Sequence, residues 1–445
     1  MVVKMRLSVL LGLLLIGLVT AQAVQAGPKI ESWQTANGAS VMFVAAPDLP
    51  MVDIRVVFDA GSARDSDLPG LAVLTNALLT DDAGQWNADQ LAERLESLGI
   101  EIGAGARRDM AWVSIRSLTD PAAYQVAMSS LAAVLAEPRF EEADLERNRQ
   151  AMQVSLRRGE QNPGTVAKKA FWKAVFGSHP YAIHSGGTQE SLAAITRQDI
   201  LAYHKRYYVA KNATVAIVGA LDRAAAETLA EQLASGLPVG EPAAKLPEVG
   251  PLNAADMQDI AFPSSQSHIL MGQPGMRRGD PDYFILYVGN HILGGSGLVS
   301  QLSEEVREKR GLSYSVYSYF SPMRRYGPFI MGAQTQNAKV EEATEVMRTT
   351  LKRFIEHGPT EDELTAAKRN ITGSFPLRIA SNSNIVEYLA MIGFYGLPLD
   401  YLDAFVGKVE SVTGEQIRDA FKRRLKPDNF VTIVVGNGQS SEQGS

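Results

Sequence analysis

The chain of 445 residues contains no cysteine. This absence excludes disulfide bonds, cysteine nucleophiles and thiolate metal sites, so an exported form would depend on its hydrophobic core alone. A basic excess is also missing, because 43 Lys and Arg residues stand against 49 Asp and Glu residues and the formal net charge is −6. Nucleic acid is therefore a poor candidate partner.

A long apolar run occurs only near the amino terminus. Lys4 and Arg6 precede the run LSVLLGLLLIGLV, and small residues follow it up to Ala26. The run is shorter than the ~20 residues that a membrane-spanning helix needs. We therefore expect residues 1–26 to be a cleaved secretory signal peptide rather than a membrane anchor, and a bacterial periplasm is the simplest compartment for the mature chain.

An internal repeat divides the rest of the chain. ITRQDILAYHKRYYVAKNATVAIVG, in the middle of the sequence, resembles VTGEQIRDAFKRRLKPDNFVTIVVG, near its end, without a gap. Each copy has helical spacing, then a turn, then an apolar strand. The pattern predicts an α+β fold of two homologous domains, residues 27–235 and 254–438, joined by the Pro- and Gly-rich linker 236–253 and followed by a flexible tail, 439–445.

Two further segments carry informative helix patterns. GLAVLTNALL, residues 70–79, predicts an amphipathic helix whose residues Leu71, Leu74 and Leu78 face a core. In LVSQLSEEVREKRGLSYSVYSYF, residues 298–320, a helix with apolar residues on one stripe ends in several cations and is stopped by a glycine. The SYSVYSYF that follows alternates like a strand.

These segments resemble the pitrilysin/insulinase family of zinc metallopeptidases. FDAGSARD and GLA at the first helix, HPYAIHSGG, YYVAKNATVAIVG and the segment 298–320 carry the resemblance, which covers nearly all of the mature chain. In active members, the helix after GLA carries H-x-x-E-H, whose histidines bind zinc while the glutamate activates a water molecule. A glutamate from a later helix is the third ligand.

This chain departs from the family at every position of that zinc site. Val73 and Ala77 replace the histidines, Asn76 replaces the base, and the third position falls near Met152 or Gln153. Valine and alanine have no lone pair to donate, and an amide is too weak a base to replace a carboxylate. None of the six histidines pairs with a suitable carboxylate at ligand spacing. We therefore expect this chain to bind no metal and no other cofactor.

The second half keeps another part of the family's machinery. The resemblance implies that Arg307 and Tyr314 reach across a closed chamber to the substrate carbonyl at a zinc site on another polypeptide. The alternative interpretation is a solvated cation at a helix end and an ordinary strand tyrosine. In some relatives a glycine-rich loop touches substrate, and here the corresponding stretch, which could equally be a plain loop, is Gly294, Gly295, Ser296 and Gly297.

The resemblance also implies a role for such a chain. Some family members are heterodimers, in which one subunit has the zinc motif and the other lacks it but retains the Arg/Tyr element. We therefore expect a noncatalytic, substrate-binding subunit of a periplasmic zinc metallopeptidase that degrades peptides or small unfolded proteins, with the zinc in a homologous H-x-x-E-H partner. Two alternatives stay open: a structural or assembly module, and a stand-alone, homodimeric peptide-binding protein.

Overall fold

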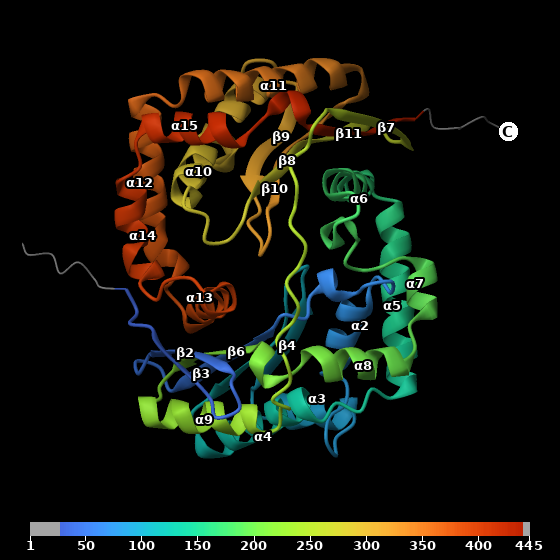
Figure 1. Ribbon diagram of the computed structural model, residues 1–445, viewed down its shortest axis with the longest axis vertical. Helices are drawn as coiled ribbons and strands as arrows, with labels where there is room; N and C mark the ends of the chain where they lie inside the picture. Colours follow the sequence, from blue (N-terminus) through green and yellow to red (C-terminus); the bar gives the residue numbers. More distant parts are fainter. Residues whose placement is uncertain (1–26, 439–445) are drawn as a thin grey trace, which may run out of the picture.

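The computed structural model describes residues 27–438, which form two α+β halves (Figure 1). The predicted signal peptide and tail lie outside the described residues. The first sheet has the strand order β1-β2-β6-β3-β5-β4, and the second has the order β7-β11-β8-β10-β9. The strands are β1 (Glu31–Gln34), β2 (Ser40–Ala45), β3 (Met51–Phe58), β4 (Glu101–Ala106), β5 (Ala111–Leu118), β6 (Ala213–Gly219), β7 (Asp256–Pro263), β8 (Gln266–Met276), β9 (Ser313–Phe320), β10 (Gly327–Gln336) and β11 (Val431–Gly438).

Helices surround both sheets. The α-helices are α2 (Leu71–Leu78), α3 (Ala88–Glu96), α4 (Pro121–Ala136), α5 (Glu142–Glu160), α6 (Pro163–Phe176), α7 (Gln189–Ala194), α8 (Arg197–Tyr207), α9 (Arg223–Ser235), α10 (Tyr283–Asn290), α11 (Val340–His357), α12 (Glu361–Arg378), α13 (Asn382–Tyr395), α14 (Tyr401–Glu410) and α15 (Gly414–Arg424). Short 3-10 or π-helical turns are η1 (Ser62–Arg64), η2 (Pro180–Ala182), η3 (Ala210–Asn212), η4 (His291–Gly295), η5 (Gly297–Val299), η6 (Ser303–Glu308), η7 (Asn337–Lys339) and η8 (Pro427–Asn429).

The two sheets have the same topology once β1 is set aside, which confirms the predicted duplication. In each, a parallel pair (β2 with β6, β7 with β11) is followed by three antiparallel neighbours. The repeated segments also begin alike. Thr196 and Thr413 each start a helix with a capping box, in which the threonine and the third helical residue satisfy each other's backbone N–H groups. Those helices, α8 and α15, lead to the equivalent strands β6 and β11.

One helix of each half packs on the sheet of the other half. Helix α6 of the first half packs on β8 and β11, whereas α13 of the second half packs on β2, β3 and β6. Phe171 of α6 is fully buried with Ile433 in one cluster, and Leu389 of α13 is buried with Val57 in another. In Figure 1 the opposite faces of the two sheets are covered by α4 and α9 and by α11. Separating the halves would therefore expose two apolar sheet faces.

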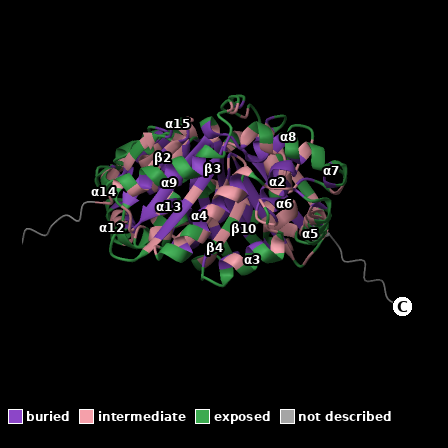
Figure 2. Cartoon of the chain, turned by 90° about the horizontal axis from the view of Figure 1, so that it is seen from below, coloured by how far each residue is buried: buried purple, intermediate pink, exposed green. Residues whose placement is uncertain are grey.

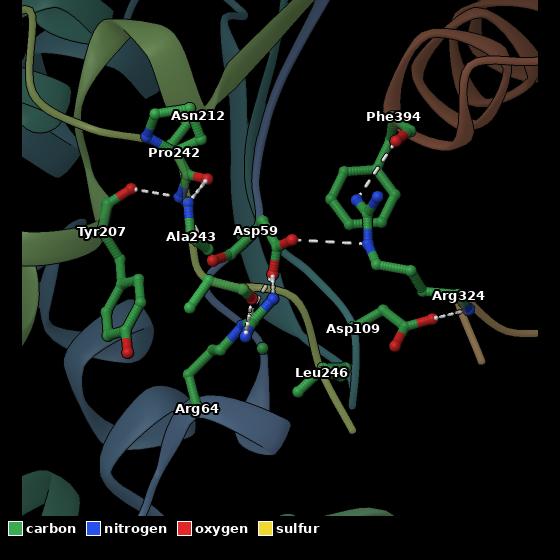
Figure 3. Close-up of polar contacts among 12 residues, drawn as sticks. Asp59, Arg64, Asp109, Tyr207, Asn212, Pro242, Ala243, Leu246, Arg324 and Phe394 are labelled. Atoms are coloured by element: carbon green, nitrogen blue, oxygen red, sulfur yellow. Dashed lines mark hydrogen bonds and ion pairs between the residues drawn. The ribbon is translucent and has the colours of Figure 1, made fainter. Parts of the chain in front are cut away.

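The connection between the halves is an extended strap, residues 236–255, without helix or strand (Figures 1 and 3). Two repeat-equivalent asparagines hold it. The side-chain oxygen of Asn212 accepts a hydrogen bond from the Ala243 backbone N–H at 3.0 Å, and Asn429 donates to the Leu252 carbonyl at 3.0 Å. Arg325 of the second half donates through Nε to the Leu246 carbonyl at 2.8 Å. The strap is thus fixed to both halves.

The helix predicted to run from residue 298 is interrupted at its start. Ser300 has an extended backbone, and its hydroxyl accepts a hydrogen bond from the Ser303 N–H, so it caps the helix that follows. Leu302 and Val306 are buried as their stripe predicts, but Leu298 lies in η5 and is 62% exposed. The prediction of one continuous helix was wrong because the serine cap begins a new helix after Leu298.

Burial follows this architecture. Figure 2 shows buried residues along the strands and exposed residues on the outer sides of peripheral helices such as α5 and α12. Among the helices between residues 27 and 438, none is both long and apolar enough to cross a membrane.

Candidate functional site

Helix α2 begins where the sequence predicts, for identifiable reasons. The buried carboxylate of Asp65 accepts hydrogen bonds from the backbone N–H groups of Gly70, at 2.7 Å, and Ala72, at 2.8 Å, and so satisfies donors at the helix start. Gly70 has φ of 97°, a left-handed conformation that favours glycine. Leu71, Leu74 and Leu78 are buried, as predicted. The GLA sequence is therefore explained by helix initiation and packing.

The position of the family's general base is occupied by a packed amide. Asn76 is 1% exposed, and its Nδ2 donates to the Trp112 carbonyl at 3.2 Å and to the Tyr208 hydroxyl at 3.3 Å. Tyr208 is itself fully buried, and this burial raises its pKa. Val73 and Ala77, one turn apart, are partly exposed on the same helix. These side chains do not fit a zinc ion, because none of them supplies an imidazole or carboxylate ligand.

The position that corresponds to the third zinc ligand of active family members also has a structural role in this chain. Met152 of α5 packs against the core of the first half, and α5 lies against α2. Gln153 is half-buried, and its backbone carbonyl accepts a hydrogen bond from the Gln189 side chain at 2.9 Å. Between residues 27 and 438, the structure contains no group of three or more His, Asp or Glu side chains placed to hold a metal ion.

The glycine-rich stretch is only partly a loop. Gly294 and Gly295 end the π-helical turn η4, which corrects the prediction of a loop over 294–297. A Cβ on Gly294 would lie 2.4 Å from the Ser318 hydroxyl, so glycine is required for η4 to pack on β9. Ser318 in turn donates to the Asn290 side chain at 2.7 Å. Ser296 is half-buried, and Gly297 is exposed with φ of 62°.

Arg307 lies on η6 among other cations that are already paired. Glu305 binds Lys309 at 2.9 Å, Arg310 at 2.6 Å and Arg353 at 3.1 Å, and these partners lower its pKa to about 2. Arg307 is not one of the cations that bind Glu305. Its Nε lies 3.3 Å from the neighbouring Glu308, and its side chain is about one-third exposed. The Glu305 cluster thus fixes the helix end while the Arg307 guanidinium stays at the surface.

Tyr314 is the most exposed large hydrophobic side chain between residues 27 and 438, at 87%. It stands near the start of β9, the edge strand of the second sheet. Strand β9 packs against η6, so Arg307 and Tyr314 come from adjoining elements. Helix α2 instead packs within the first half, on α5, α8, β4 and β5. The degenerate zinc positions thus lie in the first half of the chain, whereas the Arg/Tyr element lies in the second half.

A cavity of about 800 Å³ lies between the halves. It is lined by the β4–β5 and β9–β10 turns and by α13, and none of the site residues predicted from the sequence lines it. The wall carries five arginines beside several aromatic rings. Sequence reasoning missed this cavity, although the arginine doublets Arg107–Arg108 and Arg277–Arg278 were a visible signal.

Beside the cavity, Asp109 joins the halves. Its carboxylate accepts hydrogen bonds from the hydroxyls of Tyr181, at 2.5 Å, and Tyr395, at 2.9 Å, and from the Arg324 backbone N–H at 2.7 Å. The Arg324 side chain also reaches Asp59 at 3.3 Å (Figure 3). Because Asp109 is 3% exposed, these are buried polar contacts that require partners from both halves.

Comparisons with known proteins agree with this architecture. Residues 40–189 match the family model "Insulinase (Peptidase family M16)", and residues 194–371 match "Peptidase M16 inactive domain". The chain is 39% identical to a peptidase M16 inactive domain from Pseudomonas fluorescens, whose crystal structure it matches with a TM-score of 0.89 over 92% of this chain and 99% of that one.

More distant proteins match over similar lengths. A "Non-peptidase homolog" from Helicobacter pylori is 25% identical over 87% of this chain and 90% of its own, and an "Uncharacterized zinc protease" from Streptomyces coelicolor is 27% identical over 86% and 84%. The crystal structure of a protease from Helicobacter pylori, 19% identical, has a TM-score of 0.85 over 92% of this chain and 99% of that one, and shows the fold alone. The duplicated fold and the two matching family models together establish that the chain belongs to the M16 peptidase family.

Proposed function

We propose that this chain is a noncatalytic, substrate-binding subunit of a periplasmic zinc peptidase that acts on peptides or small unfolded proteins. The observation that carries the proposal is a contrast within one chain. Asn76 is buried, and its hydrogen bonds hold α2 against its own sheet. Arg307 and Tyr314 instead lie at the surface on adjoining elements. A guanidinium and a phenol can donate hydrogen bonds to a substrate carbonyl as charge develops on it.

The zinc in this proposal belongs to a homologous partner. Val73 and Ala77 offer no ligand atoms, so hydrolysis needs a second M16 chain that carries H-x-x-E-H. The names of the relatives support both roles within the family, because one is called a zinc protease and another a non-peptidase homologue. The partner supplies zinc and its activated water, and this chain supplies Arg307 and Tyr314.

Affinity purification from the native bacterium tests the proposal. The tagged chain should retain, in roughly equal amounts, a homologous chain with an intact zinc motif, and the complex should cleave an unstructured peptide. Chelation should abolish cleavage, and zinc should restore it. Recovery with a membrane assembly free of peptidase would instead favour an assembly module, and recovery as a homodimer that binds peptides without cleaving them would favour a stand-alone binder. Either result would contradict the proposed function.

A further inference from the structure

The wall of the central cavity is positively charged. Arg55, Arg107, Arg108, Arg278 and Arg378 line it, together with the carboxylates of Asp109 and Glu387. Glu387 pairs with Arg55 at 2.6 Å. The Asp109 oxygens already accept hydrogen bonds from two tyrosines and a backbone N–H. The wall therefore has more cations than it can neutralise, although the whole chain is acidic.

Two of these arginines crowd one indole ring. The guanidinium carbons of Arg55 and Arg107 lie 4.5 Å and 5.6 Å from the Trp112 ring centroid. Burial lowers the pKa of Arg55, and the charge of Arg107 lowers it further, despite the pairing with Glu387. Arg107 is exposed and has no carboxylate within 4 Å among residues 27–438. An anion bound close to these guanidinium groups would offset their repulsion.

A third arginine carries an unused donor. The Nε of Arg278 is buried and has no hydrogen-bond partner among the described residues. Arg108 differs, because it donates to the Tyr181 carbonyl at 3.0 Å and its guanidinium lies 3.5 Å from the Trp172 centroid. A buried donor without a partner is costly, so a ligand acceptor near Arg278 would be stabilised. Arg107 and Arg278 thus both have guanidinium donors that no carboxylate of the described residues accepts.

The remaining wall is mainly apolar and aromatic, with the polar side chains of Ser185, Ser321 and Asn384 among them. Its volume of about 800 Å³ lies within the range of small-molecule sites, roughly 300–1,000 Å³. This combination suits a ligand with an anionic end and a bulky apolar group. The apolar and aromatic lining includes Trp112, Trp172, Phe320, Met323 and Met391.

We propose that this cavity binds the free carboxylate end of a short peptide whose last residue is aromatic or large and aliphatic. Guanidinium groups bind carboxylates through two parallel hydrogen bonds, and the aromatic wall accommodates the terminal side chain. The choice of a peptide rests on the proposed function, because each peptide-bond hydrolysis creates a new carboxylate terminus. The cavity would retain product ends, or substrate ends, apart from the Arg/Tyr element.

The test uses the purified chain alone and calorimetric titration. Acetyl-Ala-Ala-Phe with a free carboxylate should bind with one-to-one stoichiometry, and the same peptide as its carboxamide should bind at least about tenfold more weakly, since a charged hydrogen-bonded pair is lost. Arg107→Gln should weaken binding of the acid by about tenfold. The main-chain bonds of Arg107 to Ser62 and Met110 are retained in this variant, so the turn should keep its conformation.

A second variant has the opposite expected effect. Glu387 competes with the ligand for Arg55, so Glu387→Gln should strengthen binding of the free acid several-fold. Arg369→Gln, on the exposed side of α12, removes the same charge as the first variant and should leave binding unchanged.

Three outcomes would overturn the assignment. The acid and the amide could bind equally, the Arg107 and Glu387 variants could bind like the parent chain, or inorganic phosphate could bind with the expected variant pattern while neither peptide binds. The measurement needs no partner subunit. Absence of peptide binding would therefore reject the cavity proposal alone, and absence of a zinc-bearing partner would reject the proposed function alone.

Discussion

Asn76 Nδ2 lies 3.3 Å from the hydroxyl oxygen of Tyr208, a residue of the segment that leads from α8 to β6. The same nitrogen donates to the Trp112 carbonyl at 3.2 Å. The position of a catalytic base in active relatives is here a buried link between α2 and its own sheet. Loss of the metal ligands therefore left a helix that still contributes to stability.

Asn76→Asp should destabilise the chain. The substitution replaces an N–H donor by a carboxylate oxygen facing the Trp112 carbonyl, and an unsatisfied buried polar contact costs about 1–3 kcal/mol, more when it is charged. Urea denaturation at pH 7 measures the loss. The difference from the parent chain should shrink toward pH 5, because a protonated carboxyl group can donate again. An unchanged midpoint at pH 7 would show that the contact does not matter.

Rebuilding the zinc motif should not rebuild the enzyme. Val73→His, Asn76→Glu and Ala77→His together restore two histidines and a base. The third position near Met152 and Gln153 still lacks a carboxylate, and Met152 packs against the core there. The triple variant should hold no tightly bound zinc and should cleave peptides little, as measured by metal analysis after chelation and reloading. One zinc per chain with chelator-sensitive cleavage would contradict this expectation.

Acid should destabilise the first half through His204. This imidazole lies near the rings of Tyr208 and Phe140, and burial lowers its pKa to about 4. A histidine whose pKa is lower in the folded state stabilises the fold fully above its unfolded pKa of about 6.5. That stability, about 3 kcal/mol, is lost as the pH falls from about 6.5 to 4. His204→Phe should flatten the pH dependence of the free energy of unfolding in this range. If the parent chain and the variant lost stability in parallel as the pH falls, the role of His204 would be disproved.

The buried hydrogen bonds through which Asp109 joins the two halves should be sensitive to the loss of one carboxylate oxygen. Asp109→Asn leaves an acceptor for Tyr181 but turns an N–H group toward Tyr395 and the Arg324 backbone. We expect a loss of about 2–3 kcal/mol in thermal or urea unfolding, because buried donors lose their acceptor. Asp67→Asn, at an exposed position, is the matched control and should change stability by less than about 0.5 kcal/mol. Equal effects of the two changes would argue against the junction.

Local features were predictable because they depend on nearby residues. The buried stripe of α2 follows from leucines at helical spacing, and the equivalence of α8 with α15 follows from two aligned segments that share a threonine cap. The break at Ser300 was missed, since the apolar spacing of Leu298 matched the helix that begins after it.

Long-range features were not predictable from one sequence. The apolar faces of α6 and α13 indicate burial, but nothing in their periodicity says that each covers the sheet of the opposite half. Likewise, Arg107 and Arg278 are far apart along the chain, and only the closed arrangement of the halves brings them to one cavity. Arg307 and Tyr314 were named through a family resemblance, and their catalytic role stays a proposal.

The most direct test reconstitutes the zinc-bearing partner with Arg307→Ala or Tyr314→Phe and follows peptide cleavage. Tyr314 is exposed and Arg307 is about one-third exposed, and both add little to the fold. Heterodimer formation, checked by sizing, should therefore be intact, as in the control Arg369→Ala. Loss of one donor to the transition state costs on the order of 10²–10³ in rate, whereas a donor used only for positioning acts mainly on KM. We predict a loss of that size in turnover for at least one variant. Near-normal kinetics in both intact heterodimers would contradict the account.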